Sequence, residues 1–184
     1  MKYLKKEKLG KTVALISFII GSILIGLFFF TEKAELLLIG YISVIFIVIV
    51  NIGVFIASLV EAVNNRILRK KLLLNSGIML LNIPVAFFYF WLMLLLLNTI
   101  RLTLVNPTDS KLTDLNISGC ESKMIDKLEP GESKTVWISI NNDCSVILNF
   151  KEEETEKTET IIGYATNMGG RKAKHKIGQG NQEL

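Results

Sequence analysis

The sequence predicts a membrane protein in which three transmembrane α-helices are followed by a small antiparallel β-sandwich. Half of the 184 residues are hydrophobic, and the long apolar stretches all lie before residue 101. After that point apolar and polar residues alternate in short segments separated by Gly, Pro and Asn. Alternation with period two, interrupted by turn residues, is typical of half-buried β-strands.

The predicted transmembrane region covers residues 1–100 and contains three apolar spans without a charged residue, at about 12–30, 36–60 and 72–100. A helix needs roughly 20 apolar residues to cross the hydrocarbon layer of a bilayer. An open strand in lipid would leave backbone groups without hydrogen bonds, so we expect helices. Pro84 is expected to kink the third helix.

The distribution of Lys and Arg predicts the orientation. Five lysines precede the first span, and the second loop holds Arg66, Arg69, Lys70 and Lys71, whereas the first loop holds one lysine. Basic residues near the ends of spans stay in the cytoplasm. We therefore expect a protein of the cytoplasmic (inner) membrane with a cytoplasmic N-terminus and an extracytoplasmic C-terminal domain.

The polar residues inside the spans permit two interpretations. Asn51 and Asn82 could line a conducting path, or they could form hydrogen bonds between helices of the bundle. We favour the second, because these spans contain none of the ionisable residues that transporters commonly use. Small residues at positions 17, 21, 22 and 26 would let helices approach closely, within the chain or in a homo-oligomer.

The C-terminal half is predicted to form an extracytoplasmic β-module over residues 101–178, followed by a flexible tail at 179–184. Six or seven short strands alternate with turns, among them "NPTDS", "EPGE", the hairpin tip "KEEETEK" and the hairpin turn "NMGG". In the last strand, "RKAKHKI", we expect His175 to be solvated. The basic residues could reach anionic lipid headgroups or an acidic partner, or they could pair with Glu156 and Glu159 across a hairpin. We favour the second.

Two of these turns, "NPTDS" after a first strand and "LEPGES" before a later one, resemble small immunoglobulin-like β-sandwich domains found outside the bacterial membrane. The resemblance covers about Leu102–Ile140. It implies a fold and a binding role, and it transfers no functional residues.

The two cysteines, Cys120 and Cys144, both lie in the β-module. Outside the cytoplasm such residues form disulfide bonds. A bridge would close a loop of about 25 residues, and it would stabilise a module whose core is small. Cys144 shares an alternating face with Val146, Leu148 and Phe150, so it should point inward.

Charge and motifs restrict the function. The basic excess belongs to residues 1–100, with a net charge of +6, whereas residues 101–184 carry −2, which argues against nucleic-acid binding. We expect no catalytic, cofactor or metal site. The expected function is non-enzymatic: residues 101–184 bind a protein partner, as an accessory subunit of an envelope complex or an immunity-type protein. The alternative is a subunit of a small oligomeric channel or transporter with Asn-lined helices.

Overall fold

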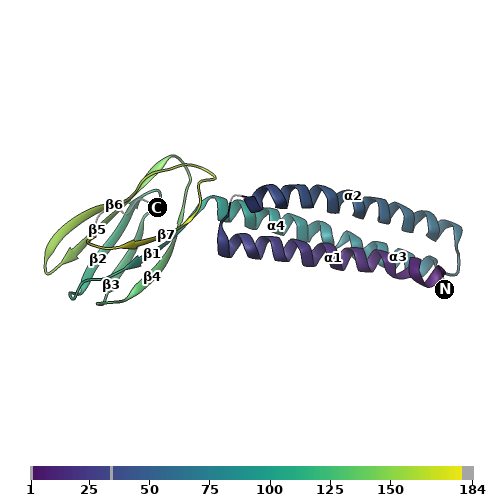
Figure 1. The fold of residues 1–184 in the computed structure, drawn as a ribbon, viewed down its shortest axis with the longest axis horizontal. Coiled ribbons are helices and arrows are strands. Elements are labelled where there is room, and N and C mark those ends of the chain that lie inside the picture. Colours follow the sequence, from purple (N-terminus) through teal and green to yellow (C-terminus); the bar gives the residue numbers. More distant parts are fainter. Residues whose placement is uncertain (1, 34, 180–184) are drawn as a thin grey trace. The chain divides into compact units, whose positions relative to one another are not determined.

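The computed structural model describes residues 2–33 and 35–179. The chain divides into two compact units, a helical unit over Met1–Met93 and a β-unit over Leu94–Leu184. Figure 1 shows both units and the labels used below.

The helical unit contains the helices α1 (Lys2–Thr31), α2 (Glu35–Asn64), α3 (Arg69–Leu80) and most of α4 (Asn82–Leu97). Three stretches are long and apolar enough to cross a membrane, at Lys8–Thr31, Glu35–Asn64 and Arg69–Leu97. Most of their side chains face outward, with at most 11% of the residues in each apolar window buried. A bundle that exposes its apolar surface in this way is suited to lipid rather than to water.

The third stretch is interrupted at Leu81, three residues before Pro84. Proline has no N–H to donate, and its ring clashes with the carbonyl group four residues earlier, here that of Leu80. The chain responds with a tighter turn, in which Leu81 N donates to Ile78 O at 3.1 Å. The interruption therefore lies about one turn before Pro84, next to the carbonyl group of Leu80 that Pro84 cannot bind.

The β-unit contains seven strands in two sheets. They are β1 (Thr99–Val105), β2 (Leu112–Gly119), β3 (Lys123–Leu128), β4 (Ser133–Ser139), β5 (Cys144–Glu152), β6 (Thr155–Ala165) and β7 (Lys172–Lys176). One sheet has the order β4-β1-β7 and the other β3-β2-β5-β6. The two sheets contribute to one hydrophobic core, in which Leu102, Leu115 and Leu148 are fully buried.

Two of the predicted turns are confirmed, one within the four-stranded sheet and one between the two sheets. Glu153 and Glu154 form the tip of the β5–β6 hairpin with φ values of 49° and 68°, as the two-residue turns of hairpins require. Gly131 has φ of 74° in the "EPGE" turn.

The interpretation of "NMGG" as a hairpin turn is wrong. Strand β6 belongs to the four-stranded sheet, and β7 crosses to the three-stranded sheet. There β7 pairs with β1 in parallel, with Leu102 opposite Ala173, so the module is not wholly antiparallel. The crossover places Ala173 of β7 and Ile177, which directly follows β7, in the shared core.

The junction between helix and strand is a single residue, Asn98. Helix α4 ends at Leu97 and β1 begins at Thr99, so the third apolar span ends as a helix before the expected position 100. Ile140 N donates to Asn98 O at 2.8 Å, and Gly170 N donates to Leu97 O at 2.7 Å. The last turn of α4 is thereby held within the β-unit by backbone hydrogen bonds.

Candidate functional site

Strand β7 is amphipathic and places a row of lysines on the outside of the three-stranded sheet. Ala173, His175 and Ile177 are buried, with exposed fractions of 4%, 4% and 1%. The alternate residues Lys172, Lys174 and Lys176 are exposed and point to the opposite face. Alternation with period two produces this arrangement directly.

The same outer face carries a stacked Arg–Trp pair. Arg101 on β1 lies opposite Trp137 on β4 in the sheet register, and its guanidinium carbon lies 5.8 Å from the centroid of the Trp137 ring. A cation over the face of an indole ring is attracted by the ring quadrupole. Arg101 is 4% exposed, and burial lowers the pKa of its guanidinium from the usual value.

Next to this pair, the hydroxyl groups of Thr103 and Thr135 form a hydrogen bond of 2.8 Å across β1 and β4. We call the whole surface the cationic face and define it as Arg101, Thr103, Thr135, Trp137, Lys172, Lys174 and Lys176. Lys174 and Lys176 make no ion pair with any residue that the structure describes. The face offers ammonium groups, hydroxyl groups and an aromatic ring, a combination suited to carboxylate-bearing partners.

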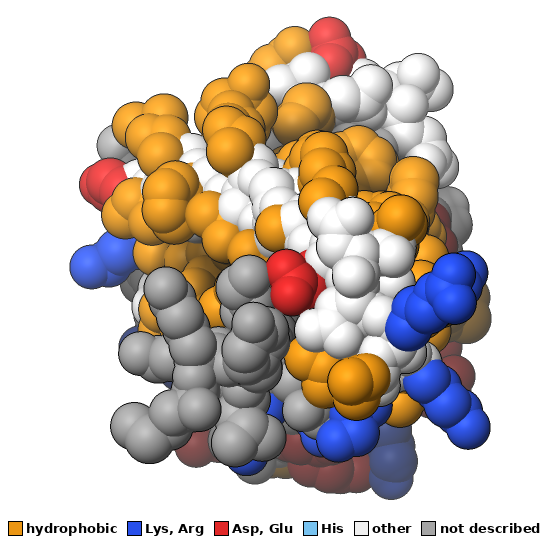
Figure 2. Space-filling model, turned by 90° about the vertical axis from the view of Figure 1, so that its right-hand side faces the viewer, with side chains coloured by type: hydrophobic (Ala, Val, Ile, Leu, Met, Phe, Trp, Pro, Cys, Tyr) orange, Lys and Arg blue, Asp and Glu red, His pale blue; other side chains and the backbone are white. Residues whose placement is uncertain are grey.

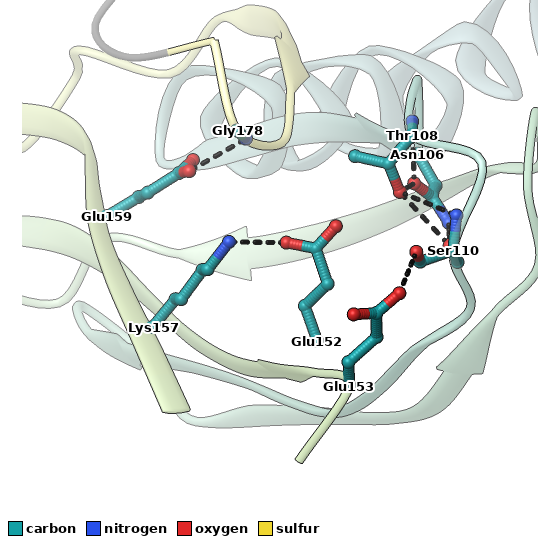
Figure 3. A network of polar contacts seen from close by, with 8 residues as sticks. All are labelled: Asn106, Thr108, Ser110, Glu152, Glu153, Lys157, Glu159 and Gly178. Atoms are coloured by element: carbon teal, nitrogen blue, oxygen red, sulfur yellow. Dashed lines mark hydrogen bonds and ion pairs between the residues drawn. The ribbon is translucent and has the colours of Figure 1, made fainter. Parts of the chain in front are cut away.

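The expected solvated position of His175 is wrong, and so is the expected pairing of the β7 lysines across a hairpin. His175 points inward, and its Nε2 lies 2.7 Å from Glu159 Oε2 on β6. Gly178 N donates to the other carboxylate oxygen of Glu159 at 2.7 Å (Figure 3). Glu159 therefore joins the edges of the two sheets, which is a structural role.

The "NPTDS" turn is held by a buried asparagine (Figure 3). Asn106 is 0% exposed, and its Nδ2 donates to Ser110 O at 2.8 Å and to Leu128 O at 3.0 Å. Its Oδ1 accepts from Thr108 N at 3.1 Å. Ser110 Oγ is linked in turn to the Glu153 carboxylate at 3.0 Å. Each of these polar groups has a hydrogen-bond partner within the network, so the network stabilises the loop.

Cys120 and Cys144 lie at disulfide distance, with their Cα atoms 5.0 Å apart. They join the end of β2 to the start of β5, which are neighbouring strands of the four-stranded sheet. Both are partly buried and pack against the core, which agrees with the inward direction predicted for Cys144.

The asparagines within the apolar helices form hydrogen bonds between helices. Asn51 Nδ2 on α2 donates to Ser17 Oγ on α1 at 2.7 Å, and Asn82 Nδ2 on α4 donates to Ala14 O at 3.1 Å. Asn51 Oδ1 is buried without a partner among the described residues. These contacts favour a packing role for both side chains.

The small residues of α1 allow a close approach within the chain. A Cβ atom on Gly21 would lie 2.6 Å from Tyr89 Cε2 of α4, a clash. The hydroxyl groups of Tyr89 and Ser22 form a hydrogen bond of 2.6 Å. At Gly26 a Cβ atom would meet open space.

Sequence reasoning considered the lysines of β7 as a contact for an acidic partner, but it missed their place beside Arg101 and Trp137, because the sheet register joins segments that are more than 30 positions apart. The available signal was the alternation of lysines with Ala173, His175 and Ile177. Comparison of the chain with protein-family models, with curated proteins and with solved structures finds no match.

Proposed function

We propose that this chain is a non-enzymatic integral membrane protein that binds an acidic protein partner through the cationic face of its β-module. It would serve as an accessory subunit of an envelope complex or as an immunity-type protein. In this proposal three helices cross the inner membrane, the N-terminus is cytoplasmic, and the β-module is an extracytoplasmic immunoglobulin-like sandwich.

The membrane part of the proposal rests on the three apolar helices and on the lysines and arginines near their ends. The sandwich part rests on the single core that draws residues from both sheets. The disulfide pair departs from the pattern of antibody domains, because it connects strands of one sheet.

The cationic face is the observation that carries the binding function. Trp is enriched in protein interfaces and is often among the residues that contribute most of the binding energy. Trp137 remains 42% exposed beside Arg101, and the lysine row of β7 extends the positive surface. The hydrogen bonds of Asn51 and Asn82 to α1 support this proposal over a channel with Asn-lined helices.

Site-specific photocrosslinking of the full chain in its native membrane tests the proposal. The crosslinking residue replaces Lys174 on the cationic face or, as a matched control, Thr158, which is exposed on β6 beside Asn149. We expect one adduct with a different protein at position 174 and none at 158. The adduct should weaken in high salt, because complementary charges would guide the association. Equal adducts at both positions, or none at 174, would refute the proposed surface.

A charge variant separates this surface from the remaining lysines of the module. We expect the double variant Lys174→Gln, Lys176→Gln to weaken the partner complex. The control variant Lys111→Gln, Lys127→Gln removes the same charge near Glu129 and should leave the complex unchanged. The two double variants must differ in their affinity for the partner if the cationic face is the binding site.

A further inference from the structure

One end of the helical unit contains a cavity of about 200 Å³ between α1 and α3. Its lining consists of Lys8, Lys11, Lys71, Leu74 and Asn75. Figure 2 looks onto this end, where the N-terminus and the α2–α3 connection lie, and shows Lys and Arg side chains on several sides of an apolar surface.

Helix geometry explains why these side chains converge. Lys8 and Lys11 are three residues apart on α1, and Lys71, Leu74 and Asn75 follow the same spacing on α3, so each set shares one helix face.

Gly10 brings the two faces together. A Cβ atom at this position would lie 3.1 Å from Met79 Sδ and 3.5 Å from Asn75 Cβ. The missing side chain therefore lets α1 approach α3 at the level of the lysines.

The lining chemistry selects an anion. Three lysines and one asparagine are among the residues that line the cavity, and no Asp or Glu lines it among the described residues. Each ammonium group supplies up to three hydrogen-bond donors. The cavity is smaller than the roughly 300–1,000 Å³ of sites for whole small molecules, so it suits a compact group such as a phosphate.

The position along the helices selects the source of that phosphate. Lys11 directly precedes the first apolar span, and Lys71 directly precedes the third. In a bilayer this is the level of the lipid headgroups. Leu74 is 66% exposed beside the cavity, and Leu15, one turn beyond Lys11, is 55% exposed; both are suited to acyl chains. A free phosphate would make no use of these apolar neighbours.

We propose that this cavity binds the phosphate headgroup of an anionic phospholipid from the leaflet that faces the N-terminus. The proposal rests on the membrane insertion inferred above and is independent of the protein partner. The lysines that precede the spans would then have a second role besides setting the orientation.

Native mass spectrometry of the purified full chain in detergent tests the proposal, with phosphatidylglycerol and phosphatidylcholine as probes. We expect wild-type protein to retain phosphatidylglycerol in preference to phosphatidylcholine. The variant Lys8→Gln, Lys11→Gln, Lys71→Gln should lose at least about tenfold in that affinity. The control Arg66→Gln, Arg69→Gln, Lys70→Gln removes the same charge at the same end of the unit, outside the cavity lining, and should keep it.

A second variant tests the geometry with every lysine retained. Gly10→Leu would force α1 away from Met79 and Asn75 and spread the lysines, so it should also weaken phosphatidylglycerol binding. Circular dichroism establishes that each variant is still helical, and single Lys→Gln variants replace any that is not.

Three outcomes would overturn the proposal. Equal retention of both lipids would remove the headgroup preference, and equal losses in the cavity variant and the control would indicate general surface charge. Full displacement of phosphatidylglycerol by millimolar inorganic phosphate would identify a soluble anion as the ligand. Each outcome leaves the photocrosslinking of the β-module unaffected, so the two proposals can fail separately.

Discussion

Opening the link between Cys120 and Cys144 should destabilise the β-module by an amount that the length of the closed loop determines. The two residues are separated by 24 positions, which gives a closed loop of about 25 residues. On the loop-entropy model a crosslink of this length stabilises the folded state by about 3.5 kcal/mol at 25 °C. For a domain of this size, that difference corresponds to a melting temperature lower by roughly 15–25 °C.

The measurement uses the isolated β-unit, residues 94–184, secreted into an oxidising compartment and unfolded with urea. Wild-type protein is compared before and after reduction, and with the double variant Cys120→Ala, Cys144→Ala. Reduction opens the loop and keeps both sulfur atoms in place, so it isolates the effect of the crosslink. The double variant additionally loses the packing of two partly buried side chains against the core and should be less stable than the reduced protein.

The single variant Cys144→Ala serves as an internal control, because it opens the same loop. It should fall between the reduced protein and the double variant. A difference below about 1 kcal/mol between oxidised and reduced wild type would contradict the reasoning. So would two free thiols in protein taken from its native membrane, since the link would then be absent where the protein works.

Three further predictions follow from single contacts and from charge. Gly119→Ala should destabilise the module by more than about 2 kcal/mol, the range for a strained backbone combined with a steric clash. The reason is that Gly119 has φ of 107° and that a Cβ atom there would lie 1.9 Å from Ser145 O. Gly131→Ala, with φ of 74° and open space around it, should cost less; equal losses in urea unfolding would argue against the clash. Glu159→Ala should cost about 1–3 kcal/mol, since the buried His175 and the backbone N–H of Gly178 would lose their acceptor; unchanged stability would show that the contact contributes nothing. Alkaline phosphatase fused after the last residue should be active, because it would lie outside the cytoplasm. An inactive fusion at normal expression would contradict the inferred orientation.

The sequence alone was sufficient for the features that depend on neighbours along the chain. The length and apolar character of the spans predict the three long helices, and period-two alternation predicts the buried residues Leu115 and Ile117 of β2 and Val146 and Leu148 of β5. The turn residues Gly131 and Glu153 mark connections that the structure contains. The inward side of Cys144 also follows from alternation with Val146 and Leu148. These features are local, because backbone geometry sets the side-chain period within a helix or a strand.

Only the tertiary structure decided which elements became neighbours. The turn before β7 looks like a hairpin turn, yet β7 lies beside β1 in the other sheet, where its apolar face completes the core. His175 has lysines on both sides in sequence and is nevertheless buried, because it shares that apolar face and meets Glu159. The register that brings Arg101 onto Trp137 and the contact at Gly10 that gathers lysines from two helices are equally non-local. Such pairings minimise the exposed apolar surface and unpaired backbone of the whole chain, and no single segment contains that information.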